Sequence, residues 1–305
     1  MKNAINYYYN MYINDLVKSN DNYRFYFDNN EYHFIIFNRP YEDIKPIYNL
    51  NVEMLKRGIL VHEIILNKQN QIITMINNKP YILLKLSDYK NNKVTLNDIR
   101  YIQNNTYNIN YGKELIRFNW IQMWSDKIDY YEYQISQLGK KYPILCDSLS
   151  YYIGLGENAI SYLSNNMRKN SINSIISVSH KRVIIDNGSY DFYNPINYVI
   201  DSRIRDLCEY IKNAFFNDEL NIIEIKSFID VSNFTKYEYI LLFSRLLFPT
   251  YYFDIYDEII NNNLDEKIIL KIIDKNKEYE KFLNDIYFYI VKEKNIFIEP
   301  VEWLL

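Results

Sequence analysis

The sequence has little glycine and proline for its length. Its 305 residues include 6 Gly and 7 Pro, and no glycine precedes Gly58. A glycine-rich loop that could cover phosphates is therefore excluded from the segment before Gly58. No stretch rich in Pro, Gly and Ser divides the chain, which excludes a long flexible linker between domains.

The cysteines and histidines do not follow a metal-binding pattern. The two cysteines, Cys146 and Cys208, lie far apart and without CxxC spacing. A disulfide framework and a thiolate zinc site are excluded, and a reducing compartment is indicated. No H-E-x-x-H pair occurs. His33 and His62 lie in strand-like runs, where we expect their side chains to face outward.

Charge and hydropathy exclude two further classes of protein. The formal net charge is −3 and no dense run of Lys and Arg occurs, so no nucleic-acid partner is implied. No apolar run approaches the roughly 20 residues that span a bilayer. The longest candidate, from Tyr239 to Phe248, contains Arg245 and stops at Pro249. The N-terminus lacks the pattern of a signal peptide, so we expect a cytoplasmic protein without a membrane span.

The abundant residues reflect a mutational bias. Asn, Ile, Lys and Tyr are frequent, and there are 33 tyrosines. Because these residues have AT-rich codons, the sequence indicates an AT-rich genome, such as that of a low-GC Gram-positive bacterium. Many of the tyrosines are then expected to fill the core or the surface without a specific role.

The N-terminal part of the sequence alternates between helical and strand-like patterns. Apolar spacing predicts a helix from Asn3 to Lys18 and another from Tyr41 to Arg57, which Gly58 ends. Two β-rich runs before the second helix predict a hairpin. Three runs follow that helix, and the first two of them are expected to form a second hairpin. The five strands are expected at 23–27, 32–37, 61–66, 71–76 and 81–86. They predict an antiparallel sheet that carries one main helix.

The remainder of the sequence is mainly helical. A strongly amphipathic helix is predicted from Leu115 to Leu138 and another from Tyr151 to Asn165. Short strands are expected at 172–178, 183–185 and 198–200. We therefore predict an α+β fold with a β-rich N-terminal lobe at 1–86, a hinge at 87–90 and a larger helical lobe at 91–305.

This arrangement and one loop resemble the protein-kinase-like superfamily of aminoglycoside and choline phosphotransferases. The catalytic loop of these enzymes reads H-G-D-x-x-x-x-N, and a second Asp follows a later apolar strand. Here H-K-R-V-I-I-D-N keeps His180 and Asn187 at that spacing, and an apolar strand leads to Asp201. The pair Asp206-Leu207 resembles the residues that brace this loop from the start of a helix.

A closer resemblance is to the kinase-like proteins associated with the spore coats of endospore-forming bacteria. The segments that carry it are Trp120–Gln134, Ser150–Ile160, Asp191–Lys212 and Pro300–Leu304. The resemblance covers most of the larger lobe and less of the smaller one. It implies the two-lobed kinase-like fold, spore-coat proteins as partners and deposition on the developing spore.

The chemistry of phosphoryl transfer defines the parts that such a fold needs. A strand Lys paired with a helix Glu contacts the phosphates, a loop Asp takes the substrate proton, and an Asn and a second Asp hold Mg²⁺. Arg39, just after the strand predicted at 32–37, is the candidate phosphate contact in place of lysine. Glu53, or alternatively Glu42, is its candidate acidic partner. Alternatively, Glu53 lies on the solvent-exposed face of the helix and binds no ligand.

The loop departs from the family at the catalytic base. Arg182 stands where the resemblance places the aspartate, and arginine does not give up its proton in proteins. It would also repel Mg²⁺. Asp186 is the candidate replacement base, although an apolar triplet separates it from Arg182. His180 is expected to pack within the loop and hydrogen-bond its backbone.

Two residues are candidate metal ligands. Asn187 keeps the loop position of a magnesium ligand, but Asp186-Asn187-Gly188 is also a hairpin-turn sequence. Asp201 follows an apolar strand, as a magnesium-binding Asp does in the family. The alternative for Asp201 is an ion pair with an arginine, namely Arg182, Arg203 or Arg205. Both interpretations stay open for each residue.

Three functions are consistent with these residues. The first is a pseudokinase, a binding or scaffold module linked to the spore coat that uses no cofactor. The second is an active atypical kinase of small molecules or proteins, which would require ATP and Mg²⁺ and the convergence of Asp186 and Asp201. The third is a purely structural assembly protein, which an exposed tyrosine surface would favour. Arg182 favours the first, and the sequence carries no signal for an oligomeric state.

Overall fold

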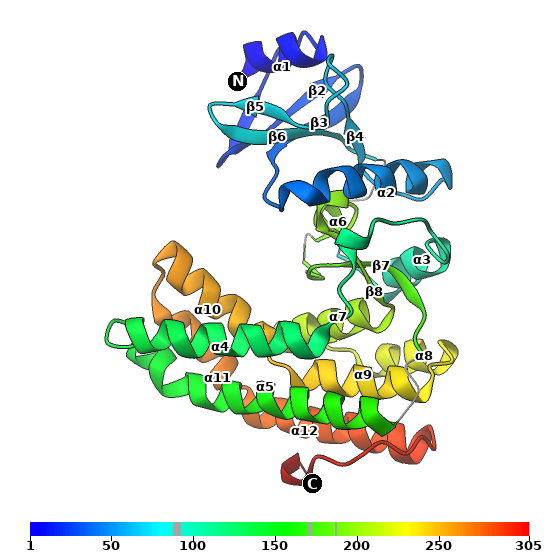
Figure 1. Cartoon of the computed structure of the whole chain (residues 1–305), viewed down its shortest axis with the longest axis vertical. Coiled ribbons are helices and arrows are strands. Elements are labelled where there is room, and N and C mark those ends of the chain that lie inside the picture. The colour runs from blue at the N-terminus through cyan, green and yellow to red at the C-terminus, as the bar shows by residue number, and fades with distance from the viewer. Residues whose placement is uncertain (88–92, 170–172, 187, 305) are drawn as a thin grey trace. The chain divides into compact units, whose positions relative to one another are not determined.

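The chain forms two compact units in the computed structural model, which describes residues 1–87, 93–169, 173–186 and 188–304 (Figure 1). The first unit comprises Met1–Arg117 and Ile176–Asp201, and the second comprises Phe118–Ile175 and Ser202–Leu305. The first unit holds the large β-sheet and the second is helical, so the predicted α+β class is confirmed.

The two units do not follow the predicted domain ranges. The segment 176–201 groups with the N-terminal sheet although it comes much later in the chain. Its backbone carbonyls accept hydrogen bonds from Arg39 and from the backbone N–H of Arg117, which both belong to the first unit. Of the predicted hinge at 87–90, all but Ser87 lies outside the described residues.

An antiparallel sheet forms the centre of the first unit. Its strands lie in the order β1, β2, β3, β6, β4, and β5 also pairs with β6. The strands are β1 (Val17–Ser19), β2 (Asn22–Phe27), β3 (Asn30–Ile36), β4 (Glu63–Ile65), β5 (Thr74–Ile76) and β6 (Lys79–Lys85). Helix α1 (Lys2–Tyr9) packs Ile5 and Tyr9 against Phe34 and Leu83 of the sheet. Further helices of this unit include α2 (Ile44–Lys56), after a 3₁₀ turn at Tyr41–Asp43, and α3 (Leu96–Asn105).

Asparagine and aspartate adopt the left-handed backbone conformations that glycine adopts in most proteins. In the described residues, 12 non-glycine residues have positive φ, and all of them are Asn or Asp. These two residue types tolerate the left-handed region better than other L-residues. Asp28 and Asn29 lie at φ 46° and 60° between β2 and β3, and Asn77 and Asn78 lie at φ 50° and 60° between β5 and β6. Both are two-residue turns of the kind that favours a hairpin.

Three of the secondary-structure predictions made from the sequence were wrong. The helix predicted from Asn3 to Lys18 ends at Tyr9, because Asn10 adopts φ 54°, and the later residues lead into β1. β4 and β5 do not pair with each other, since each pairs with β6. Residues 183–185 form no strand; their backbone belongs to the loop that follows His180.

The second unit is built around one buried helix. Every residue of α9 (Lys236–Leu247) from Tyr237 onward is buried, and α9 packs against α5, α7 and α12. The other main helices are α4 (Trp120–Leu138), α5 (Pro143–Lys169), α7 (Ile204–Phe216), α8 (Ile222–Val231), α10 (Thr250–Asn262) and α12 (Asn276–Phe288). The helix predicted from Leu115 begins five residues later than expected, at Trp120. Among all described helices, none is both long and apolar enough to cross a membrane.

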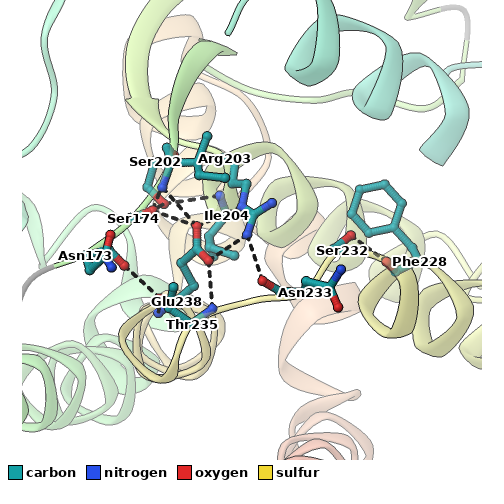
Figure 2. Close-up of polar contacts among 11 residues, drawn as sticks. Asn173, Ser174, Ser202, Arg203, Ile204, Phe228, Ser232, Asn233, Thr235 and Glu238 are labelled. Atoms are coloured by element: carbon teal, nitrogen blue, oxygen red, sulfur yellow. Dashed lines mark hydrogen bonds and ion pairs between the residues drawn. The ribbon is translucent and has the colours of Figure 1, made fainter. Parts of the chain in front are cut away.

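A buried carboxylate joins the N-terminal ends of α7 and α9 (Figure 2). The side chain of Glu238 is 0% exposed and forms a bidentate pair with Arg203, at 2.7 Å to Nε and 2.8 Å to the second terminal nitrogen. It also accepts hydrogen bonds from the backbone N–H groups of Ile175 and Thr235 and from Ser174 Oγ. Burial alone would raise the pKa of Glu238, but these donors, with Arg203 foremost, hold it below its ordinary value.

Replacement of Glu238 by glutamine should destabilise the protein by about 3 kcal/mol at pH 7, because it leaves Arg203 buried without its anion. The lowered pKa of Glu238 means that this stability is present above its unfolded pKa and is lost as the pH falls below that value. Urea denaturation at pH 7 and pH 4 measures both effects. Glu224→Gln, at an exposed site in the first turn of α8, is the control and should change stability by less than about 0.5 kcal/mol. An equal loss in both variants would contradict the assignment.

Candidate functional site

The loop that resembles a catalytic loop begins at the end of a short hairpin. β7 (Ile176–His180) pairs with β8 (Tyr198–Ser202) in a two-stranded sheet. The backbone N–H of Lys181 donates to the carbonyl of Asn197, 2.9 Å away, and the N–H of Gly188 donates to the carbonyl of Ile185. The loop is thus closed by its own backbone and leads into the short helix α6 (Ser189–Phe192).

His180 braces this loop from inside. Its ring is 0% exposed, and Nε2 lies 2.8 Å from the carbonyl oxygen of Phe192. The ring also stacks on Phe192 at 4.0 Å and meets Tyr198 edge-on at 5.1 Å. For the hydrogen bond to form, Nε2 must carry the proton. A histidine held in this way positions the backbone of the loop and fits the structural role expected for it.

Arg182 and Asp186 occupy different surroundings along the loop. The guanidinium of Arg182 is partly buried and donates to the carbonyl of its neighbour Lys181 at 2.8 Å. Asp186 is exposed at the end of the loop, where its carboxylate lies 3.0 Å from Nζ of Lys93. Such a surface pair contributes little stability. Asn187, the other candidate in this loop, lies outside the described residues.

Asp201 lies at the end of β8 and is 0% exposed. The strand is held at this point by the backbone N–H of Arg117, which donates to the carbonyl of Ile200 at 2.9 Å. At phosphoryl-transfer sites, Mg²⁺ is usually bound through one or two carboxylates, and phosphate oxygens and water complete its octahedron. Within the described ranges, no group of three or more His, Cys, Asp or Glu side chains converges to hold a metal ion. Asp201 is a carboxylate of the kind that binds Mg²⁺, to which nucleotide phosphates and water would supply the further ligands.

Arg39 clamps the hairpin to the N-terminal part of the first unit. Its guanidinium is buried and lies 2.8 Å from the carboxylate of Asp43. One terminal nitrogen also donates to the carbonyls of Ile196 and Tyr198, at 2.9 and 2.5 Å. The sequence analysis took Arg39 for a phosphate contact, whereas these bonds engage its guanidinium with protein groups.

Glu53 pairs within its own helix. Its carboxylate lies 3.0 Å from Nε of Arg57 on the next turn, and both side chains are about a third exposed. The terminal nitrogens of Arg57 donate to the carbonyls of Tyr107 and Asn108. This is the geometry of a solvated helix face rather than of a phosphate contact. β3 itself carries no lysine.

His62 does not face outward as expected. It is 0% exposed, its ring lies 5.2 Å from that of Tyr190, and Nδ1 lies 3.1 Å from Ser87 Oγ. Burial, with His33 nearby, lowers the pKa of His62 to about 3. It is therefore a neutral core residue at physiological pH. The prediction failed because His62 precedes β4 rather than lying on the solvent face of a strand.

A cluster of cations next to the loop was missed by the sequence analysis. Arg39, Arg117 and Lys181 gather near Asp43, and a terminal nitrogen of Arg117 lies 3.9 Å from the Asp43 carboxylate. Burial and the two arginines lower the pKa of Lys181 to about 8, which Asp43 only partly opposes. We call Arg117 and Lys181, with Arg39 behind them, the loop cation cluster. Two adjacent basic residues at 181 and 182 were its only signal in the sequence.

The substitution Arg39→Met should lower the free energy of unfolding by about 3–5 kcal/mol, because it leaves Asp43 buried without a partner and removes donors from two carbonyls. Chemical denaturation at neutral pH measures the loss. Lys79→Met, which removes an exposed pair with Asp21, should change stability by less than about 1 kcal/mol. Similar small losses in both variants would show that Arg39 is not the clamp.

Lys181→Met should have the opposite effect and raise the free energy of unfolding at pH 7 by about 1 kcal/mol, a value that allows for solvent screening of this partly exposed lysine. The pKa of Lys181 is lower in the folded protein, so its protonated form costs stability below pH 8. The wild type recovers that cost as the pH rises from about 8 toward the unfolded value of 10.5, and the difference from the variant should shrink by pH 10. Paired urea titrations at pH 7 and pH 10 measure it. A less stable variant at pH 7 would contradict the lowered pKa.

Comparison with known proteins gives a family and a fold. The family model described as "Spore coat putative kinase YutH" matches residues 2–286. The endospore coat-associated protein YutH of Bacillus subtilis (strain 168) is 30% identical over 209 residues, which span 61% of this chain and 61% of that relative.

Solved structures show the same fold at low sequence identity. An aminoglycoside phosphotransferase from Alicyclobacillus acidocaldarius superposes with a TM-score of 0.64 and 9% identity, covering 94% of this chain and 95% of its own. A spectinomycin phosphotransferase solved with ADP and spectinomycin has a TM-score of 0.57 and 12% identity, covering 98% and 94%. The two-lobed phosphotransferase fold predicted from the sequence is therefore confirmed.

Proposed function

Because the chain belongs to the family of putative spore-coat kinases that carries the name YutH, we propose that it is a pseudokinase that serves the spore coat as a binding module. It has the shape of a phosphotransferase but does not transfer phosphate. Fold alone does not establish this, since one fold hosts many functions. The argument comes from the loop.

The observation that carries the proposal is the arginine at position 182. A kinase loop needs a group that accepts the proton of the attacking hydroxyl. The guanidinium of Arg182 stays charged at any physiological pH and has no lone pair for a proton. Its positive charge also opposes the binding of Mg²⁺ nearby. The same residue thus removes the base and disfavours the metal.

The other candidate parts support the same conclusion. β3 carries no lysine, Arg39 is engaged by Asp43 and two carbonyls, and Glu53 pairs with Arg57. None of these described side chains has the geometry of a lysine–glutamate pair that contacts the phosphates of a nucleotide. We therefore expect weak or absent nucleotide binding, and no cofactor.

The family supports a proposal for the place of action. The relative in Bacillus subtilis is named an endospore coat-associated protein. We propose that this chain is likewise made in the cytoplasm, is deposited on the developing spore, and has coat proteins as its partners. A module that binds without turnover suits such an assembly.

An active kinase is the second candidate, and Asp201 favours it. This aspartate lies near the end of β8, the strand that pairs with β7. An active enzyme would bind ATP with Mg²⁺, hold the metal through Asp201, and use a base other than the residue at 182. Asp186 is accessible but is paired with Lys93.

Calorimetry distinguishes the two candidates. We expect no magnesium-dependent heat when ATP is titrated into the full chain up to millimolar concentration, and no release or transfer of γ-phosphate. Micromolar, magnesium-dependent binding that Asp201→Asn abolishes would overturn the proposal. Asparagine is chosen because it preserves the volume of the buried side chain, and circular dichroism of the variant controls for folding.

A further inference from the structure

A groove lies along the second half of α5, within the second unit. Its other wall is formed by residues 299–303 of the C-terminal segment, drawn in red in Figure 1. The groove encloses about 490 Å³, within the roughly 300–1,000 Å³ that is typical of sites for small ligands. Every described residue that lines it belongs to the second unit, so the groove does not involve the loop after His180.

Hydrogen bonds hold the C-terminal wall of the groove in place. Tyr162 Oη donates to the carbonyl of Glu299 at 2.9 Å, and Nζ of Lys169 lies 3.1 Å from the Glu299 carboxylate. Farther along the segment, the side-chain amide of Asn284 in α12 donates to the carbonyl of Leu304. The wall is therefore fixed to α5 at one end and to α12 at the other, and a groove that is already formed lowers the entropic cost of binding.

The helix wall carries side-chain amides. Nδ2 of Asn158 donates to the carbonyl of Gly154, 2.8 Å away, and Nδ2 of Asn165 lies 3.3 Å from Ser161 Oγ. Each bond fixes an exposed amide on its own helix and uses one of its two N–H donors. The second N–H and the oxygen of both amides have no further partner among the residues that the structure describes, so these groups can bind a ligand.

The C-terminal wall contains the most exposed tryptophan of the chain. Trp303 is 44% exposed, whereas Trp120 and Trp124, the remaining two of the 3 tryptophans, are buried. An indole ring is a large apolar surface with a single N–H donor, and tryptophan is enriched where proteins bind partners. An exposed ring beside a groove therefore provides a flat face on which an apolar surface of a ligand can stack.

The charges of the groove favour an uncharged ligand. The ionisable side chains of its described lining are Lys169, Glu299 and Glu302, and the first two pair with each other. One negative charge is left, which would repel a phosphate or a nucleic acid. A sugar ring fits these walls better. Hydroxyl groups around its edge donate and accept hydrogen bonds, as amides do, and the C–H groups of its faces stack on aromatic rings.

We propose that this groove binds a neutral saccharide, with the amides of Asn158 and Asn165 on its hydroxyl groups and Trp303 against the face of a ring. The saccharide is either a single sugar or a unit of a glycan chain. The inference goes beyond the proposed function and uses none of the residues that carry it, so the two fail separately. Binding is non-covalent, and no bond forms or breaks.

Tryptophan fluorescence of the full chain provides the test. Because Trp120 and Trp124 are buried, quenching by acrylamide reports mainly on Trp303. Glucose, N-acetylglucosamine and a linear tetramer of each are added separately, and calorimetry measures the affinity. We expect at least one of these probes to bind and to protect Trp303 from acrylamide.

The tetramers distinguish the two sources of the saccharide. Tighter binding of a tetramer than of its monomer identifies a glycan chain as the ligand, and equal affinity identifies a single sugar. Neither protection nor heat with any of the four probes, up to tens of millimolar for the monomers, would overturn the site.

Matched variants assign the binding to the groove. Trp303→Ala should weaken it by about tenfold, and Asn158→Ala by about fivefold, as measured by calorimetry. Asn105→Ala is the control for the amide, because Nδ2 of this exposed residue donates to the carbonyl of Tyr101 at 2.8 Å on a helix of the first unit. Tyr133→Ala removes an exposed ring of α4 that does not line the groove. Both controls should bind as the wild type does.

Two results would refute this assignment. One is equal affinity in Trp303→Ala and the wild type, and the other is an equal loss of affinity in the controls and the groove variants. Urea denaturation of each variant separates a lost site from a lost fold.

Discussion

The buried guanidinium of Arg39 is the interaction on which the candidate site depends. It joins Asp43, four residues later in the sequence, to the carbonyls of Ile196 and Tyr198 at the start of β8. Burial of the Arg39 guanidinium without these partners would destabilise the fold, and burial of any of the partners without the guanidinium would do so too. Arg39 therefore fixes the start of β8, and the backbone N–H of Arg117 holds the same strand farther on, at Ile200.

Local sequence signals predicted much of the fold. Alternating apolar residues gave the strands β2 and β3, and Asp28-Asn29 supplied the turn between them. What failed was non-local: β4 and β5 each pair with β6, and no pattern within either strand distinguishes that partner from its neighbour. The first helix was extended too far because Asn10 has no feature that separates a left-handed stop from an ordinary polar position.

The sequence suggested candidate site residues only where they form a local motif of neighbouring residues. The candidate role of Arg182 came from the spacing of His180 and Asn187 and stays a prediction. The roles of Arg39 and Lys181 were not apparent, because they depend on carbonyls that lie far away in the sequence, those of Ile196 to Tyr198. A backbone carbonyl has the same chemistry in every residue, so the sequence does not mark which ones an arginine will meet.

Protein groups hold the described part of the loop in place. His180 bonds to the carbonyl of Phe192, Lys181 to that of Asn197, and Arg39 holds the strand behind them. The resemblance to kinases places an aspartate where this chain has Arg182. None of these hydrogen bonds is made by the side chain at position 182, so the backbone of the described loop tolerates the change from an acid to a cation there.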